Sequence, residues 1–309
     1  MKKQKLTLNQ AVAGYMMNLE ARHLSRNTIN DYTNTLRKFC EYAGNPEVSG
    51  ITVDMITGFL VSRTDLSNKT LSNYHSTLSA LWAWLERQEL TDKNILRLID
   101  RPKPEKRQIV PLEEHEVKAL FKALNKSTEY ARPGKRRSDH TLPNAERNRA
   151  ILMLLLDSGL RVTELANIKI QDLDERNLRI FVMGKGSKER YAPYSARTGQ
   201  VIWKYLTQRE DLDPEDYLFV TKQGRQMHRR LIHQTLEDLG ARAGVENVHP
   251  HRLRHTFAVS YLRAGGDIFT LQMILGHENL DMVRHYSKLA SMDVKRVHRR
   301  ASPVEFFKL

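Results

Sequence analysis

The chain has 309 residues, enough for about two domains, and its 50 Lys and Arg residues outnumber its 36 acidic residues, which gives a formal charge of +14. This excess favours a polyanionic partner, nucleic acid before an anionic membrane surface, over a merely well-solvated basic surface. The longest apolar run, 150–156, is far shorter than the roughly 20 residues of a membrane-spanning helix, and the single cysteine, Cys40, excludes an internal disulfide and a cysteine-based zinc site, which fits a cytoplasmic protein without a membrane partner.

Apolar residues at helical spacing predict helices throughout the first hundred residues. The expected spans are about 7–22, 27–42, 52–62 and 69–89, with Thr7 or Asn9, then Asn27 or Thr28, then Thr52 as capping residues. The last span carries Tyr74, Trp82 and Trp84. Because these aromatic residues recur at helical spacing, we expect core packing rather than platforms for stacked bases.

A charged segment with two prolines, 101–107, predicts a solvated linker over 101–109, between a first domain of 1–100 and a second of 110–290. The second domain opens with a helix to about residue 124. A basic stretch, 131–138, follows and is interpreted as a loop, with contact to phosphate groups left open.

Beyond that loop the pattern predicts an apolar helix over 145–158 that ends at Gly159. The period then changes, and 177–183 and 189–193 are expected as strands on either side of a glycine-bearing turn. Helices return at about 197–208, 229–243, 251–264, 269–275 and 280–289, before a C-terminal tail over 291–309. The predicted fold class is therefore mainly α with a small β-sheet, the second domain being mixed α/β.

Candidate catalytic residues lie in four short segments of the second domain. Each has an ordinary explanation when taken alone: a surface arginine paired with Glu164, a lysine in a common Gly-Lys-Gly turn, a solvated polar helix face, a hydrogen-bonding histidine at a helix corner, and a core tyrosine. In chain order the candidates are Arg161, Lys185, His251, Arg254, His277 and Tyr286.

Taken together, these six residues are the parts needed to break and rejoin a phosphodiester without metal or ATP. Two arginines can hold the phosphate oxygens, on which charge builds in the transition state, because the guanidinium fork binds two oxygens and stays charged. A lysine can protonate a leaving oxygen. A tyrosine can act as nucleophile if nearby cations and a proton acceptor activate its phenol, whose ordinary pKa is about 10.

The motifs that carry these residues resemble those of the tyrosine recombinase (phage integrase) family, in the form of a compact, Xer-like, two-domain member. The matching segments are Asp157-Ser-Gly-Leu-Arg-Val-Thr-Glu-Leu165, Gly184-Lys-Gly-Ser-Lys-Glu-Arg190, His251-Arg-Leu-Arg-His-Thr-Phe257, and Leu275-Gly-His277 with Tyr286 nine residues later. The first hundred residues resemble the SAM-like core-binding domain of the family by pattern and position only.

The resemblance implies a role for each candidate. Tyr286 would attack the scissile phosphate to form a 3′-phosphotyrosyl link, and Arg161 and Arg254 would hold the non-bridging oxygens. His277 would support the phosphate, His251 would take the tyrosine proton, and Lys185 would protonate the leaving oxygen. Lys188, Arg190, Arg252 and His255 are further candidates for DNA contact. No cofactor is expected.

The resemblance also implies that the two domains clamp double-stranded DNA at specific sites, where the protein acts as a homotetramer, with a paired recombinase or accessory protein left open. The tail, with Phe306 and Phe307, would be exchanged between protomers or would cap its own. Three departures from relatives stand out: Val283 where threonine is common, Thr163 where serine is common, and a longer loop around 131–138. None removes a catalytic group.

Two alternatives to a site-specific recombinase remain open. A type IB topoisomerase-like enzyme would use similar chemistry to nick and close DNA as a monomer, although the separate helical domain and compact motifs favour a recombinase. A DNA-binding protein with a relic active site would have no need for Tyr286. The sequence does not distinguish integration, excision, resolution and inversion, and it does not reveal the target site.

Overall fold

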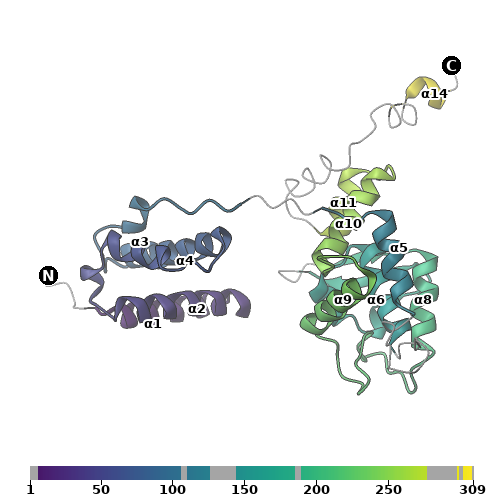
Figure 1. The fold of residues 1–309 in the computed structure, drawn as a ribbon, viewed down its shortest axis with the longest axis horizontal. Helices are drawn as coiled ribbons and strands as arrows, with labels where there is room; N and C mark the ends of the chain where they lie inside the picture. Colours follow the sequence, from purple (N-terminus) through teal and green to yellow (C-terminus); the bar gives the residue numbers. More distant parts are fainter. Residues whose placement is uncertain are drawn as a thin grey trace, which may run out of the picture. The chain divides into compact units, whose positions relative to one another are not determined.

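A computed structural model describes residues 6–105, 110–125, 144–184, 189–276, 298 and 302–307. The chain divides into two compact units, Met1–Gln108 and Ile109–Leu309, which are drawn in Figure 1 and described separately below. The mainly helical architecture with a small sheet that the sequence predicts is confirmed.

The first unit is built from helices α1 (Leu8–Ala21), α2 (Arg26–Ala43), α3 (Val53–Val61) and α4 (Asn68–Arg87), with short 3-10 turns at Val48–Gly50 and Ile95–Leu98. Thr7 and Thr52 cap their helices as expected. The expected capping residue of α2, Asn27 or Thr28, is wrong by two or three residues. Ser25 is the cap, and its hydroxyl accepts the Thr28 N–H at 3.2 Å, which satisfies a backbone donor that a start at Asn27 or Thr28 would leave open.

Aromatic side chains form the centre of the first unit. Phe39 and Phe59 are fully buried, and Trp82 and Tyr74 are nearly so. The rings of Phe39 and Phe59 meet edge to face with centroids 5.2 Å apart, while Phe59 stacks on Tyr74 at 5.9 Å. The expectation that Tyr74 and Trp82 are core residues rather than stacking platforms is thus confirmed, because no face of a buried ring is available to a base.

In the second unit, helices lie around α6 (Figure 1), and strand β3 of a small sheet also contacts α6. The helices are α5 (Glu114–Ala123), α6 (Ala145–Ser158), α7 (Val162–Asn167), α8 (Ala196–Leu206), α9 (Arg229–Ala243), α10 (Pro250–Arg263) and α11 (Ile268–Leu275). A 3-10 turn, Ile170–Asp172, leads into the sheet, and α14 (Pro303–Phe307) lies in the tail. The short helix α7 is absent from the sequence prediction, because its six residues are too few to show a period.

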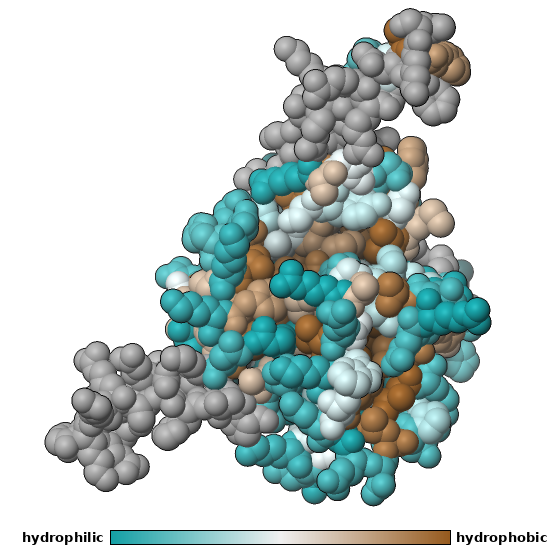
Figure 2. Space-filling view, turned by 90° about the vertical axis from the view of Figure 1, so that its right-hand side faces the viewer, coloured by the Kyte–Doolittle hydropathy of each residue, from teal (hydrophilic) through white to brown (hydrophobic). Residues whose placement is uncertain are grey.

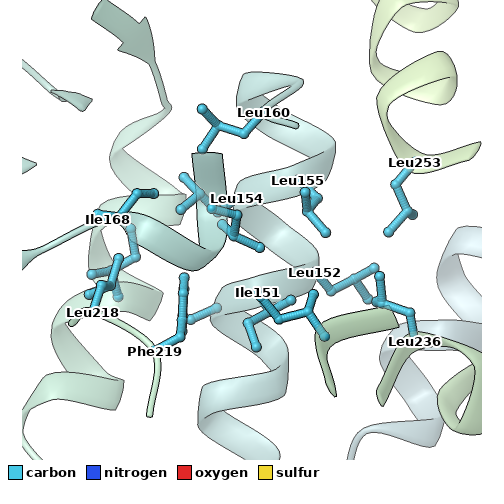
Figure 3. Packing of buried hydrophobic residues seen from close by; sticks show 14 of the residues in the cluster. Ile151, Leu152, Leu154, Leu155, Leu160, Ile168, Leu218, Phe219, Leu236 and Leu253 are labelled. Atoms are coloured by element: carbon cyan, nitrogen blue, oxygen red, sulfur yellow. The ribbon is translucent and has the colours of Figure 1, made fainter. Parts of the chain in front are cut away.

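Leucine and isoleucine side chains of α6 fill the core of the second unit. Ile151, Leu152, Leu154 and Leu155 are completely buried, and Figure 3 shows them pointing toward side chains of several other elements. Helices α8 and α10 both pack on α6. A helix that is apolar on nearly every side at its C-terminal half has to be central, and its C-terminal end is thereby fixed in the middle of the unit.

The sheet is antiparallel, with β1 (Leu173–Asp174), β2 (Arg179–Met183) and β3 (Glu189–Pro193) paired in that order. The register of β2 and β3 sets Phe181 opposite Tyr191 and Met183 opposite Glu189. The two strands closest to the turn agree with the sequence prediction within two residues, whereas β1 is too short to be seen as a pattern. Gly184 follows β2, and residues 185–188, which join it to β3, lie outside the described residues.

The surface of the second unit turned toward the viewer in Figure 2 is mostly hydrophilic at its edge, with hydrophobic residues gathered nearer its centre. In the tail, Val304 and Phe307 of α14 expose 56% and 64% of their surface. Within the described ranges, no helix is both long and apolar enough to cross a membrane.

Gly159 connects α6 to the candidate site with a left-handed backbone, φ +61°. A Cβ at this position would lie 2.4 Å from Cδ1 of Phe257 and 2.8 Å from Cδ2 of Leu275. We expect Gly159→Ala to lower the free energy of unfolding by about 2–5 kcal/mol, combining left-handed strain with overpacking. Gly224→Ala is the matched control, because Gly224 has φ +72° and open space around it. Urea unfolding of both variants measures the difference, and equal losses would contradict the packing argument.

Candidate active site

Arg161 is placed by the turn that ends α6. Gly159 ends α6, and Leu160, the next residue, is completely buried. Arg161 follows with an extended backbone and is the capping residue of α7. Its guanidinium donates to Oε1 of Glu164 at 2.9 Å and to the carbonyl oxygen of Gly276 at 3.1 Å. A third of the side chain remains exposed. Arg161 is therefore held from two sides and still open to a ligand.

Arg254 lies on α10 and is 3% exposed. Its Nη1 donates to the carbonyl oxygen of Gly159, and its Nη2 donates to the carbonyl oxygen of Leu275 at 2.8 Å. These carbonyls are the free backbone acceptors at the ends of α6 and α11, where cations are stabilised. One arginine thus joins three helices and places its charge next to that of Arg161.

The end of α11 is common to both arginines. Arg254 binds the carbonyl of Leu275, and Arg161 binds the carbonyl of Gly276, which closes the helix with φ +60°. His277 is the next residue in the sequence. Lys185, Lys188, His277 and Tyr286 lie outside the described residues, so their roles stay predictions.

His251 lies in the first turn of α10, one turn before Arg254. Partial burial lowers the pKa of its imidazole below the ordinary value of 6.5, and the charges of Arg254, Arg161 and His233 lower it further. The imidazole is therefore neutral at pH 7 and able to accept a proton. The structure accordingly brings Arg161, His251 and Arg254 together, three of the six residues that the sequence predicts.

Of the candidates for DNA contact, Arg190 lies within this cluster, on β3. Its Nη2 donates to Oε2 of Glu164 at 2.9 Å, and its side chain is 12% exposed. Burial lowers the pKa of this guanidinium, an effect that Glu164 opposes and Arg161 adds to. Arg190 is thus directed into the protein, toward Glu164.

The remaining described candidates, Arg252 and His255, are also engaged inside the protein. Arg252 donates to the carbonyls of Val110 and Glu246 at 3.0 and 2.6 Å and to the carboxylate of Glu116. His255 is 8% exposed. Contact of these two side chains with DNA stays a prediction, and in this structure Arg252 is held by backbone and carboxylate groups of the protein.

The sequence predicts only part of the role of Glu164 in the site. The i, i+3 spacing to Arg161 does indicate a salt bridge, and that bridge is present. The sequence contains no signal, however, for the second bridge, from Arg190 on another element, 26 residues away. The interpretation of Arg161 as a salt-bridged arginine is confirmed, and its role as a phosphate ligand stays a prediction.

The cluster can bind an anion and accept a proton beside it. Arginine forks suit a phosphate group, and fixed cations stabilise charge that develops on its oxygens. Across the described ranges, no group of three or more His, Cys, Asp or Glu is arranged to hold a metal ion.

A fold and site of this kind belong to enzymes that exchange DNA strands, and the chain belongs to the phage integrase family. The model of the phage integrase family matches residues 110–292, and the model of the phage integrase N-terminal SAM-like domain matches residues 12–89. The chain is thus a tyrosine-type site-specific recombinase. Both the family and the class that the motifs resemble are confirmed.

Among curated proteins, the chain is 32% identical over 297 residues to the tyrosine recombinase XerC of Staphylococcus epidermidis, covering 94% of this chain and 95% of that one. Among solved structures, XerA recombinase is 27% identical with a TM-score of 0.51, covering 96% of this chain and 99% of the other. The XerH site-specific recombinase bound to a palindromic difH substrate, at 24% identity, shares the fold with a TM-score of 0.71, covering 92% and 82% of the two chains.

The lowered pKa of His251 predicts the acid limit of DNA cleavage. Because the imidazole stays neutral to a pH below 6.5, cleavage that uses it as base should persist below pH 6.5 and fail as the pH falls through the lowered pKa. The same shift makes the folded state lose stability below pH 6.5, since the unfolded chain takes up the proton first.

Single-turnover cleavage at low DNA concentration measures how the cleavage rate depends on pH. His251→Gln should be slow and lose this acid limb, while His115→Gln, at an exposed position of α5, should keep it. An unchanged limb in His251→Gln would assign the base elsewhere.

Proposed function

We propose that the chain cleaves and rejoins double-stranded DNA through a 3′-phosphotyrosyl intermediate at Tyr286. The tyrosine oxygen forms a bond to phosphorus as the bond from phosphorus to the 5′ oxygen breaks. His251 accepts the phenol proton, and Lys185 gives a proton to the leaving oxygen. The energy of the phosphodiester is kept in the covalent link, so that a 5′ hydroxyl can reverse the step without ATP.

The observation that carries this proposal is the pair of guanidinium groups at the end of α11. Arg161 and Arg254 are held by main-chain carbonyls of Gly276, Leu275 and Gly159, so their positions do not depend on flexible partners. Cations fixed before the substrate arrives need no reorganisation when charge develops on the phosphate. We assign them to the non-bridging oxygens, with His277, the residue after Gly276, as a further donor.

The proposed partner is double-stranded DNA with specific recombination sites, bound by both units of the chain. The formal charge of +14 favours phosphate contacts, which supply salt-dependent affinity, while base contacts choose the site. The XerH neighbour is a site-specific recombinase bound to its DNA substrate. We propose a homotetramer on two DNA sites in the cytoplasm, with the C-terminal tail, 291–309, exchanged between protomers.

A covalent-capture experiment tests this function. Cells expressing the chain beside its native flanking DNA are lysed under denaturing conditions, and DNA linked to the protein is sequenced. We expect adducts at one short sequence. A plasmid carrying two copies of that sequence should then yield recombinants, whereas relaxation of a one-site plasmid without recombination would indicate a topoisomerase-like enzyme. DNA binding without any adduct would indicate a relic active site.

A further inference from the structure

The carboxylate of Glu164 lies at the centre of the site. Its side chain is 3% exposed, and it accepts from the backbone N–H of Arg161 at 2.7 Å, from Nη1 of Arg161 at 2.9 Å, and from Nη2 of Arg190 at 2.9 Å. Two guanidinium groups from different elements, the start of α7 and strand β3, therefore share one buried negative charge.

A buried carboxylate in contact with Arg161 creates an electrostatic problem for catalysis. The negative charge of Glu164 offsets the positive charge of Arg161, and burial of the Glu164 carboxylate limits screening of this pair by water. An arginine paired one-to-one with a carboxylate would present a nearly neutral pair to the phosphate. Glu164 fixes the geometry of Arg161, but it weakens the attraction between Arg161 and the phosphate unless a second cation is present.

Arg190 is that second cation, because its guanidinium pairs with Glu164. Nε and Nη1 of Arg190 are buried and have no hydrogen-bond partner among the described residues. A buried cation with incomplete hydrogen bonding costs stability. The glycine that Arg161 binds also leaves space for it, because a Cβ on Gly276 would lie 2.9 Å from Nε of Arg190. The chain therefore contains a buried arginine at this position although its incomplete hydrogen bonding lowers stability.

We propose that Arg190 is a positioning residue that neutralises Glu164, so that Arg161 keeps its positive charge for the scissile phosphate. The sum of charges on Arg161, Glu164 and Arg190 is +1, and it falls to zero when Arg190 is lost. Arg190 acts through Glu164 and does not itself touch the DNA. This inference rests on the proposed function, because it assigns Arg161 to the phosphate.

If Arg190 neutralises Glu164, its loss has a consequence that loss of a purely structural residue would not have. Arg190→Met should slow single-turnover cleavage of a nicked suicide substrate by roughly 10- to 100-fold, the scale of a nearby unit charge at the effective dielectric constant of proteins. Adding Glu164→Gln should restore most of the rate, because it removes the charge that Arg190 had neutralised. If Arg190 merely packs the hairpin, the double variant should be slower than either single variant.

The control is Arg179→Met on the neighbouring strand β2. Arg179 also pairs with a carboxylate, Asp174, at 2.8 Å, but it is 40% exposed and has no contact with Glu164 among the described residues. Its loss should leave the cleavage rate within about twofold of wild type. Thermal unfolding and DNA-binding measurements on every variant show whether a slow rate reflects a folded, DNA-bound protein.

A second substrate tests whether charge causes the slow cleavage by Arg190→Met. A methylphosphonate at the scissile position carries no negative charge, so the ratio of wild-type to Arg190→Met cleavage rates should fall toward one. A ratio unchanged from that of the natural phosphate, or a double variant that is not rescued, would overturn the role of Arg190. Failure of the wild-type protein to form any adduct on the phosphate substrate would instead overturn the proposed function.

Discussion

Replacing Tyr286 by phenylalanine is expected to abolish covalent cleavage while leaving DNA binding unchanged. The substitution removes one oxygen, the proposed nucleophile, and no positive charge. Affinity for DNA comes mainly from cations that contact phosphates, so it should be unaffected. The measurement is the yield of protein–DNA adduct on a suicide substrate, compared with the Kd from a gel-shift assay at the same salt concentration.

Tyr191→Phe is the matched control for this experiment. Tyr191 is a tyrosine of β3 that is 51% exposed, and its ring contacts with Phe181 and Arg179 do not involve the hydroxyl. It should form adducts at the wild-type rate. Adduct formation by Tyr286→Phe at that same rate would show that another residue is the nucleophile.

Arg254→Lys is expected to reduce cleavage at least about 100- to 1,000-fold, equivalent to roughly 2.7–4 kcal/mol of transition-state stabilisation. Lysine keeps the charge, but one ammonium group cannot reach the carbonyls of Gly159 and Leu275 and also present a fork to the phosphate. The loss should fall on the maximal single-turnover rate more than on the Kd for DNA, because the transition state carries the extra charge.

Arg252→Lys, two residues earlier on α10, separates catalysis from folding. Arg252 donates to the carbonyls of Val110 and Glu246 and to Glu116, and its side chain is 12% exposed. Its replacement should cost about 1–3 kcal/mol of stability with little change in the cleavage rate of the folded protein. If Arg252→Lys and Arg254→Lys lose cleavage equally, the assignment of Arg254 to the phosphate fails.

Much of the fold could be predicted because its helices are long and strongly patterned. The helices around Leu36 and Leu154 and the hairpin that leads to Gly184 follow from periodicity and glycine placement. The elements missed are short. The helix Val162–Asn167 and the strand Leu173–Asp174 contain too few residues to show a period, and contacts with distant segments determine them.

The site could be predicted in its residue types but not in its connections. Local motifs indicate Arg161, His251 and Arg254 only when they are taken together, because each residue alone has an ordinary structural explanation. That Arg254 binds two helix ends, or that Glu164 serves Arg161 and Arg190 together, depends on contacts 21, 26 and 95 residues apart in sequence. Arg252 illustrates the same limit, because its position beside a catalytic motif does not reveal that carbonyl and carboxylate groups of the protein are its partners.

The contacts of Arg254 with the carbonyls of Gly159 and Leu275 have a consequence for deep mutational scanning. A library scored only for cellular abundance should tolerate substitutions at Tyr286 that preserve size, and should reject most substitutions at Arg254. The same library scored for recombination should reject both. Subtracting the two score maps would therefore separate residues that only perform the chemistry from residues, such as Arg254, that also stabilise the fold.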